Sequence, residues 1–156
     1  MDSLRIVRVA GALLVGLTVL AASCADPQGA GSPQPIGAAE LSERIRAGSP
    51  PRILDVRTRE EYAAGHVPGA VNIPYDELSS RLAEIDADKA AEVVVYCQSG
   101  RRADVAEGLL RRAGYTNLRD LEGHMQAWNR SGYPTNCIRP TRLAQSTPEV
   151  VACRSR

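Results

Sequence analysis

Short β-rich runs alternate with segments of helical apolar spacing from about residue 36 to residue 134, and this alternation constrains the fold most. Two parallel strands need a crossover connection between them, and a helix usually supplies it. The strands of a parallel sheet are apolar on both sides, so the sheet has to be covered on both faces. The pattern therefore predicts an α/β domain with a central parallel sheet and helices on both faces.

The expected elements are short, and glycines and prolines separate them. Strands are predicted over residues 52–56, 70–73, 93–96 and 117–121, and helices over residues 39–47, 58–64, 76–85, 102–113 and 125–130. Thr58 with Glu61 three residues later indicates a capping box at the start of the second helix. At 156 residues, of which 44% are hydrophobic, the chain has room for one globular domain.

Charge and aromatic content exclude some functions. The chain carries 19 Lys and Arg against 18 Asp and Glu, a formal net charge of +1, so it has no basic footprint for nucleic acid. Aromatic residues make up 4% and Phe is absent, which leaves no platform for base stacking. For these two reasons a nucleic-acid partner is not expected. Neither a Gly-x-Gly-x-x-Gly pattern nor a Walker loop occurs in the sequence, so dinucleotide and nucleotide binding have no support.

The residues after the most apolar strand carry the chemistry. Cys97 follows residues 93–96, and the chain then enters a helix through Gln98, Ser99, Gly100, Arg101 and Arg102. Ligands of parallel sheets bind at the carboxyl ends of strands, and a glycine turn at a helix start directs backbone N–H groups toward anions. These groups and the two arginines favour thiolate over thiol, so Cys97 is expected to be a nucleophile. The alternative is a small buried core residue.

The loop from Cys97 to Arg102 resembles the six-residue active-site loop of rhodanese-type sulfurtransferases. Residues 55–74 are similar to the N-terminal signature of that family, and residues 121–128 are similar to its C-terminal signature. The resemblance implies one rhodanese-like domain over residues 37–134. It also implies that Cys97 is the catalytic sulfur carrier, and that the substrate is bound by the rest of the loop, Gln98, Ser99, Gly100, Arg101 and Arg102.

The activity that this resemblance implies is that of a thiosulfate sulfurtransferase. Cys97 takes sulfur from thiosulfate or a related donor as a persulfide, and cyanide or a thiol then removes it. The expected partners are thus a small anionic sulfur donor and a thiophilic acceptor, with no metal and no organic cofactor. Asp55 is expected to support the site by ordering nearby loops. Arg57 either widens the positive mouth or belongs to a solvated helix start.

Two other functions stay open on the same fold. Dual-specificity phosphatases of the Cdc25 kind share the architecture, and an arsenate-reductase-like oxyanion enzyme is a related possibility. The phosphatase loop is one residue longer between its Cys and Arg, whereas the six residues from Cys97 to Arg102 suit sulfur. A non-catalytic rhodanese-like binding module is the third interpretation, and such modules usually lack the Cys.

One residue departs from the family pattern. His124 stands after Gly123, where the family usually has a second glycine. The added side chain could crowd or polarise the region beside the active-site loop. We expect a tolerated surface substitution rather than a catalytic histidine. His66 lies inside the N-terminal signature and is expected to be a packing residue.

The N-terminus has the pattern of an export signal. Arg5 and Arg8 precede an apolar run over residues 9–22, which is too short to cross a bilayer as a permanent helix. The small residues before Cys24 resemble a bacterial lipobox, which predicts a signal peptide over residues 1–23 and a lipid on Cys24. Ordinary cleavage after Ala25 is the alternative. The protein is then expected in the cell envelope, lipid-anchored to a membrane or otherwise periplasmic or secreted.

The segments on either side of the domain receive separate interpretations. Residues 24–36 consist mainly of Pro, Gly, Gln and Ala and are expected to be a flexible tether. Residues 135–156 form a tail without a clear apolar period, which either lies on the domain or is solvated. Because exported proteins meet oxidising conditions, Cys137 and Cys153 are expected to form a disulfide. The alternative is that Cys137 attacks the persulfide of Cys97.

Overall fold

Four strands form the parallel sheet that the sequence predicts. The computed structural model describes residues 35–139 and 149–153. The strands are β1 (Arg52–Asp55), β2 (Val71–Asn72), β3 (Val93–Tyr96) and β4 (Leu118–Asp120), in the spatial order β2-β1-β3-β4. All neighbouring pairs are parallel, and β3 lies between β1 and β4. The prediction of an α/β fold around a central parallel sheet is confirmed.

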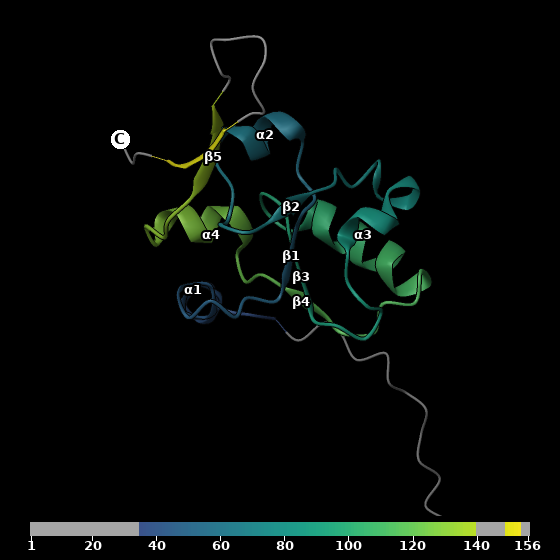
Figure 1. Cartoon of the computed structure of the whole chain (residues 1–156). Helices are drawn as coiled ribbons and strands as arrows, with labels where there is room; N and C mark the ends of the chain where they lie inside the picture. The colour runs from purple at the N-terminus through teal and green to yellow at the C-terminus, as the bar shows by residue number, and fades with distance from the viewer. Residues whose placement is uncertain (1–34, 140–148, 154–156) are drawn as a thin grey trace, which may run out of the picture.

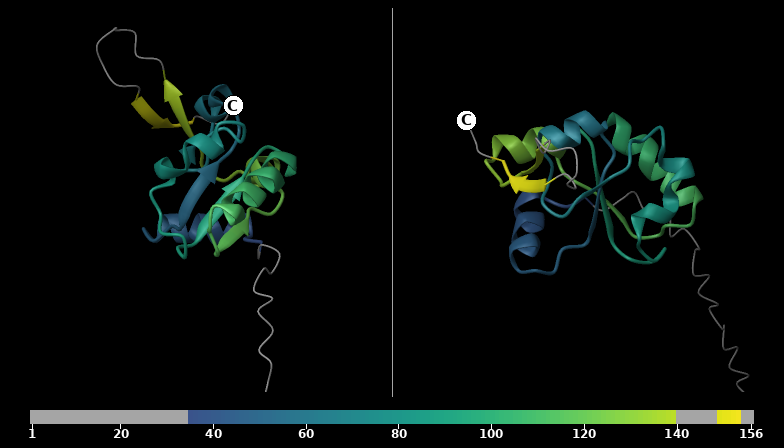
Figure 2. Two further views of the ribbon diagram at one scale, coloured as in Figure 1. Left: turned by 90° about the vertical axis from the view of Figure 1, so that its right-hand side faces the viewer. Right: turned by 45° about the horizontal axis from the view of Figure 1, so that its top comes forward.

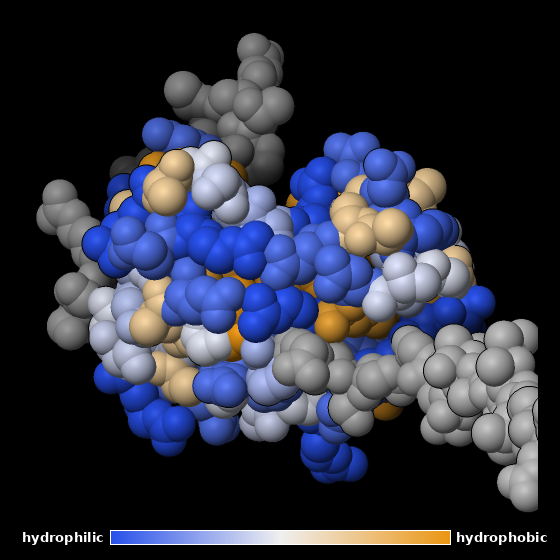
Figure 3. All heavy atoms as spheres, turned by 90° about the horizontal axis from the view of Figure 1, so that it is seen from below, coloured by the Kyte–Doolittle hydropathy of each residue, from blue (hydrophilic) through white to orange (hydrophobic). Residues whose placement is uncertain are grey.

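Helices cover both faces of this sheet, as Figure 1 shows. On one face lie α1 (Ala38–Arg46) and α4 (His124–Arg130), and on the other lies α3 (Arg101–Arg112). Side chains of a strand alternate between faces, so β3 contributes to two cores. Val93 and Val95 pack with the α3 side, whereas Val94 and Tyr96 pack with the α1 and α4 side. Seen from below, the surface is mainly hydrophilic (Figure 3).

The segment expected to be an α-helix over residues 76–85 has a different structure. It consists of two short 3₁₀ turns, η1 (Leu78–Ser80) and η2 (Leu82–Ile85). Arg81 separates them because its backbone, at φ −120° and ψ 19°, leaves the helical region. The predicted α-helix is therefore wrong. The apolar spacing still has its expected effect, since Leu78 and Ile85 are fully buried.

The capping box at the next helix is confirmed. In α2 (Arg59–Ala64), the Thr58 side chain accepts a hydrogen bond from the Glu61 N–H at 3.3 Å. The Glu61 carboxylate accepts one in return from the Thr58 N–H at 3.0 Å. These two bonds satisfy backbone donors at the start of a helix that has only six residues.

The tail contains two strands that the sequence did not indicate. β5 (Asn136–Arg139) and β6 (Glu149–Ala152) pair antiparallel, and a disulfide joins Cys137 to Cys153 with a Cα–Cα distance of 5.3 Å. Asn136 also forms a bridge with His66, which places the strand pair beside α2 (Figure 2). The tail therefore packs on the domain over its described part.

We expect a peptide map of the non-reduced protein to contain a disulfide-linked pair of Cys137 and Cys153 peptides. The two residues are 16 positions apart, and a loop of about that length contributes about 3 kcal/mol in the chain-entropy model. Urea unfolding with and without reductant measures this contribution to the free energy of unfolding. The stability of a Cys137→Ala/Cys153→Ala variant should not change when reductant is added. A Cys97–Cys137 peptide that forms during turnover would favour the alternative of an attacking Cys137.

The expected export signal over residues 1–23 and Cys24 lie outside the described residues, as does most of the tether. Ile36, the last residue of the expected tether, is fully buried and forms a parallel bridge with Leu121. Within residues 35–139 and 149–153, no helix has the length and apolar character to cross a membrane.

Candidate active site

Cys97 lies at the carboxyl end of the central strand β3. The strand is fully buried, and Cys97 itself is 1% exposed. It is the one free cysteine among the described residues. This position follows from the apolar sequence of β3, because a strand between two others must bury both of its faces. The chain then turns at once into α3, so the sulfur lies where the N-terminus of a 12-residue helix begins.

Gly100 brings a backbone donor to the sulfur. Its N–H donates a hydrogen bond to Cys97 Sγ at 3.1 Å. This geometry depends on a backbone with φ 116° and ψ −50°, which residues with a Cβ rarely adopt. Gly100 also precedes the first turn of α3, and its carbonyl accepts from the Asp104 N–H at 3.0 Å. Partial positive charge at this helix start therefore faces the sulfur.

The start of α4 orients the rest of the loop. The Met125 N–H donates to the Cys97 carbonyl at 3.1 Å, and the Gln126 N–H donates to the Gln98 carbonyl at 3.3 Å. In a trans peptide the N–H points opposite to the carbonyl. The N–H groups of Gln98 and Ser99 therefore point away from α4, and neither has a hydrogen-bond partner among the described residues. The loop thus presents free donors to an anion.

A pocket of about 500 Å³ opens at the sulfur, lined by Tyr75, Cys97, Ser99, Arg101, Arg102 and Val105. The residues predicted to bind the substrate thus include three that line it. Tyr75 and Val105, which the sequence analysis did not single out, are 38% and 50% exposed. Both are large hydrophobic residues at the mouth. Apolar contact is therefore available beside the charged groups.

The two arginines of the loop have different environments. Arg102 forms a bidentate ion pair with Glu61 of α2, at 2.6 and 2.9 Å. The hydrogen bonds from Arg102 are the main cause that lowers the pKa of Glu61 to about 2. Arg101 is exposed and makes no ion pair with any described residue. Arg101 therefore supplies the free charge of the mouth, while Arg102 is fixed in place.

The sequence did not reveal the role of Glu61 as the partner of Arg102. The two residues are 41 positions apart, and the capping-box pattern had already explained the carboxylate. One of its oxygens serves both functions, because Oε2 accepts from the Thr58 N–H and from Arg102. Only the packing of α2 beside the start of α3 reveals the second partner.

Asp55 and Arg57 form a buried ion pair that does not line the pocket. Arg57 Nη2 lies 2.6 Å from Asp55 Oδ2, and the backbone N–H of Arg57 donates to Asp55 Oδ1 at 2.9 Å. The same guanidinium donates to the carbonyl of Gly65 at 2.8 Å. Arg57 is 4% exposed, so both expectations for its side chain are wrong. It neither reaches the mouth nor is solvated, because Asp55 holds it inside.

His124 is not the surface residue that we expected. Its side chain is 8% exposed, and its Nε2 lies 3.0 Å from the point where a Cβ on Gly100 would be. The backbone of His124 has a positive φ of 51°, directly after Gly123 at φ 65°. The expectation is wrong because the turn after β4 brings the start of α4 against the Cys97 loop. The predicted crowding beside this loop is thus present.

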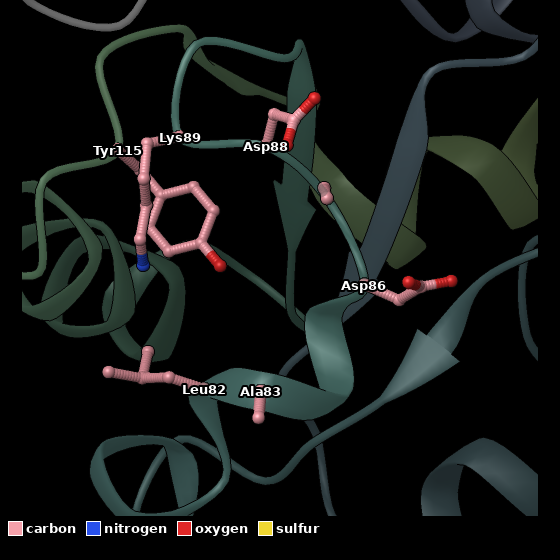
Figure 4. Close-up of a pocket in the computed structure, with 7 residues that line it drawn as sticks. Leu82, Ala83, Asp86, Asp88, Lys89 and Tyr115 are labelled. Atoms are coloured by element: carbon pink, nitrogen blue, oxygen red, sulfur yellow. The ribbon is translucent and has the colours of Figure 1, made fainter.

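A second hollow, of about 670 Å³, lies at the other end of the strands from Cys97. Its residues precede β3 and β4, so they lie at the amino ends of these strands, away from Cys97. Lys89 lies over the ring of Tyr115, with 3.8 Å from Nζ to the ring centroid (Figure 4). The side chain of Asp86 points away from this pair in the same view. The hollow holds no cysteine or histidine and is open to solvent, so it is not the candidate site.

Comparisons with known proteins show which family the chain resembles. The sequence model described as a rhodanese-like domain matches residues 37–131. The human thiosulfate:glutathione sulfurtransferase is 40% identical over 111 residues, which cover 64% of this chain and 95% of the relative. The HTH-type transcriptional regulator Rv0324 of Mycobacterium tuberculosis is 41% identical over 109 residues, which cover 68% of this chain. The match spans only 46% of that regulator.

A solved structure gives the same result for the fold. The crystal structure of the Alr3790 protein from Anabaena sp. superposes with a TM-score of 0.61 at 35% sequence identity. The superposition covers 66% of this chain and 82% of the Anabaena chain. The range matched by the family model, residues 37–131, contains the Cys97 loop.

Proposed function

This chain belongs to the rhodanese-like domain family, and we propose that it transfers sulfane sulfur from thiosulfate or a related donor to a thiophilic acceptor through a persulfide on Cys97. The observation that carries the proposal is the short loop in which the Gly100 N–H donates to Cys97 Sγ at 3.1 Å. Relatives named as sulfurtransferases support the same class of reaction.

The first step uses the thiolate as the nucleophile. Cys97 attacks the outer sulfur of thiosulfate, and the new S–S bond forms as the S–S bond of thiosulfate breaks. The bonding electron pair leaves with sulfite. A thiolate and a thiosulfate dianion become a persulfide anion and a sulfite dianion, so charge balances without a proton. The N–H of Gly100, together with those of Gln98 and Ser99, stabilises the negative terminal sulfur.

The second step returns the enzyme to the thiolate. Cyanide or a thiolate attacks the terminal sulfur of the persulfide and leaves as thiocyanate or as a new persulfide. The electron pair of the broken S–S bond returns to Cys97. Arg101 attracts the incoming anion, and Tyr75 with Val105 offers apolar contact to an organic acceptor.

The test measures thiocyanate produced from thiosulfate and cyanide by the purified protein, with an aryl phosphate as the matched alternative substrate. We expect sulfur transfer, because the six residues from Cys97 to Arg102 form a small loop suited to one sulfur atom. Hydrolysis of the aryl phosphate without sulfur transfer would instead identify a phosphatase. Loss of both activities in a folded protein would favour a binding module.

We also propose that Cys24 carries a lipid that anchors the protein to a membrane. The basic and apolar segment before Cys24 and the Pro- and Gly-rich residues after it support this proposal. Removal of residues 1–23 takes away Asp2, Arg5 and Arg8, which changes 19 positive and 18 negative side chains to 17 of each. Attachment would then depend on the lipid rather than on net charge.

Mass spectrometry of the N-terminus of the native protein checks the anchor. We expect a peptide that begins at Cys24 and carries acyl groups, and we expect a Cys24→Ser variant to lose membrane attachment. An unmodified peptide that begins at Asp26 would instead demonstrate ordinary cleavage and secretion.

A further inference from the structure

Three polar side chains, each with a buried polar atom, gather near the active-site loop without lining its pocket. They are Glu107 of α3, Asp120 of β4 and His124 of α4, here called the buried cluster. Each has one buried atom without a hydrogen-bond partner among the described residues: Glu107 Oε1, Asp120 Oδ1 and His124 Nδ1. His124 Nδ1 lies 3.6 Å from Asp120 Oδ1, which is too long for a hydrogen bond. Unsatisfied buried polar atoms are rare and suggest a function.

His124 connects the buried cluster to the loop. Its Nε2 lies 3.0 Å from the point where a Cβ on Gly100 would be, so the ring rests against Gly100. The N–H of Gly100 is the donor to Cys97 Sγ. His124 also keeps a backbone at φ 51°, which is costly for a residue with a side chain. A strained, buried histidine therefore supports the residue that contacts the sulfur.

Acidic groups dominate the surroundings of the buried cluster. From α3 come Asp104 and Glu107, with Arg111 at 3.4 Å from Glu107, while β4 and the following turn contribute Asp120 and Glu122. Burial is the main cause that raises the pKa of Glu107 to about 7 and that of Asp120 to about 6. Burial also lowers the pKa of His124, which the charge of Asp104 opposes. Burial thus favours the protonated form of the two carboxyl groups and the uncharged form of the ring.

We propose that His124 is a positioning residue that supports Gly100 and couples proton uptake by the buried cluster to anion binding at the Cys97 loop. This inference rests on the proposed function. A proton taken up on the His124 ring, which rests against Gly100, makes the region beside the loop less negative. An anion at the loop is then bound more tightly. Because coupling is reciprocal, a bound anion must also raise the proton affinity of His124.

The experiment uses a Cys97→Ser variant, which lacks the one free thiol of residues 35–139 and 149–153 and is expected to show no turnover. The chain has only two histidines, so imidazole NMR resolves both. We expect saturating thiosulfate to raise the pKa of His124 by about half a unit, which equals about threefold tighter binding to the protonated form. His66 is the internal control, since it is buried like His124 but stacks on Tyr62 at 3.7 Å. Its pKa should not change.

Two further variants separate the ring from the carboxylates. In Cys97→Ser/His124→Asn, the carboxylates still titrate, but no ring that can hold a proton touches Gly100. We expect its Kd for thiosulfate to be equal at about pH 5.5 and about pH 7.5, whereas Cys97→Ser alone binds about threefold more weakly at the higher pH. The matched control, Cys97→Ser/His66→Asn, should keep the threefold difference.

The outcomes are distinguishable from failure of the proposed function. The intact mass of wild-type protein treated with thiosulfate is measured, and the addition of one sulfur atom indicates a persulfide. If the sulfur is gained but the pKa of His124 does not respond to thiosulfate, the coupling is overturned and sulfur transfer stands. If His124→Asn keeps the pH dependence, the carboxylates act without the ring and the role of His124 is overturned. If no sulfur is gained, the proposed function and this inference fail together.

Discussion

We expect the Cys97→Ser variant to lose sulfur transfer from thiosulfate to cyanide by more than about 10³-fold, because removal of a covalent nucleophile leaves only binding. Serine retains the size of the residue and can accept the hydrogen bond from the Gly100 N–H. It lacks the soft, polarisable sulfur, so no persulfide can form. Steady-state thiocyanate production measures the loss.

The fold should survive this substitution. Cys97 is 1% exposed, but the change is nearly isosteric, so near-ultraviolet circular dichroism and the urea midpoint should stay close to those of the wild type. Cys97→Ala should lose the activity to the same extent. Turnover retained in Cys97→Ser would contradict the mechanism, whether or not Cys137 and Cys153 form their disulfide.

The second large effect is expected from Gly100→Ala. Gly100 has a φ of 116°, and a Cβ there would lie 3.0 Å from His124 Nε2. We expect a destabilisation of about 2 to 4 kcal/mol from backbone strain and overpacking. We also expect activity to fall by about 10²-fold, since a displaced loop moves the N–H away from the sulfur. Urea unfolding and the thiocyanate assay measure the two effects.

Gly114→Ala is the matched control for this substitution. Gly114 also has a positive φ, 92°, but a Cβ there would meet no atom within 4 Å. It should lose stability through strain alone and keep its activity. A Gly100→Ala/His124→Gly variant should recover part of the lost stability, because the ring that the Cβ would meet is removed. Full activity in Gly100→Ala would mean that this loop conformation does not matter for the reaction.

The sequence alone was sufficient for the order of the four strands of the parallel sheet and for the place of Cys97. Periodicity is a local property, so the strand over residues 93–96 and the helix that follows are visible without knowledge of distant contacts. Parallel pairing then follows from the alternation, and it places the end of β3 where ligands bind. The capping box of α2 is equally local, because Thr58 and Glu61 are three residues apart.

The environment of individual side chains was decided only by the tertiary structure. The pairing of Arg102 with Glu61 spans 41 positions, and the tail strands β5 and β6 pair without any apolar period to indicate them. The burial of His124 against Gly100 depends on how the turn after β4 directs the chain. Burial and ion pairing arise where segments distant in sequence meet, and local spacing contains no information about that approach. The pattern of residues thus determined the sheet and the position of Cys97, and packing between distant segments determined which charges and rings surround that cysteine.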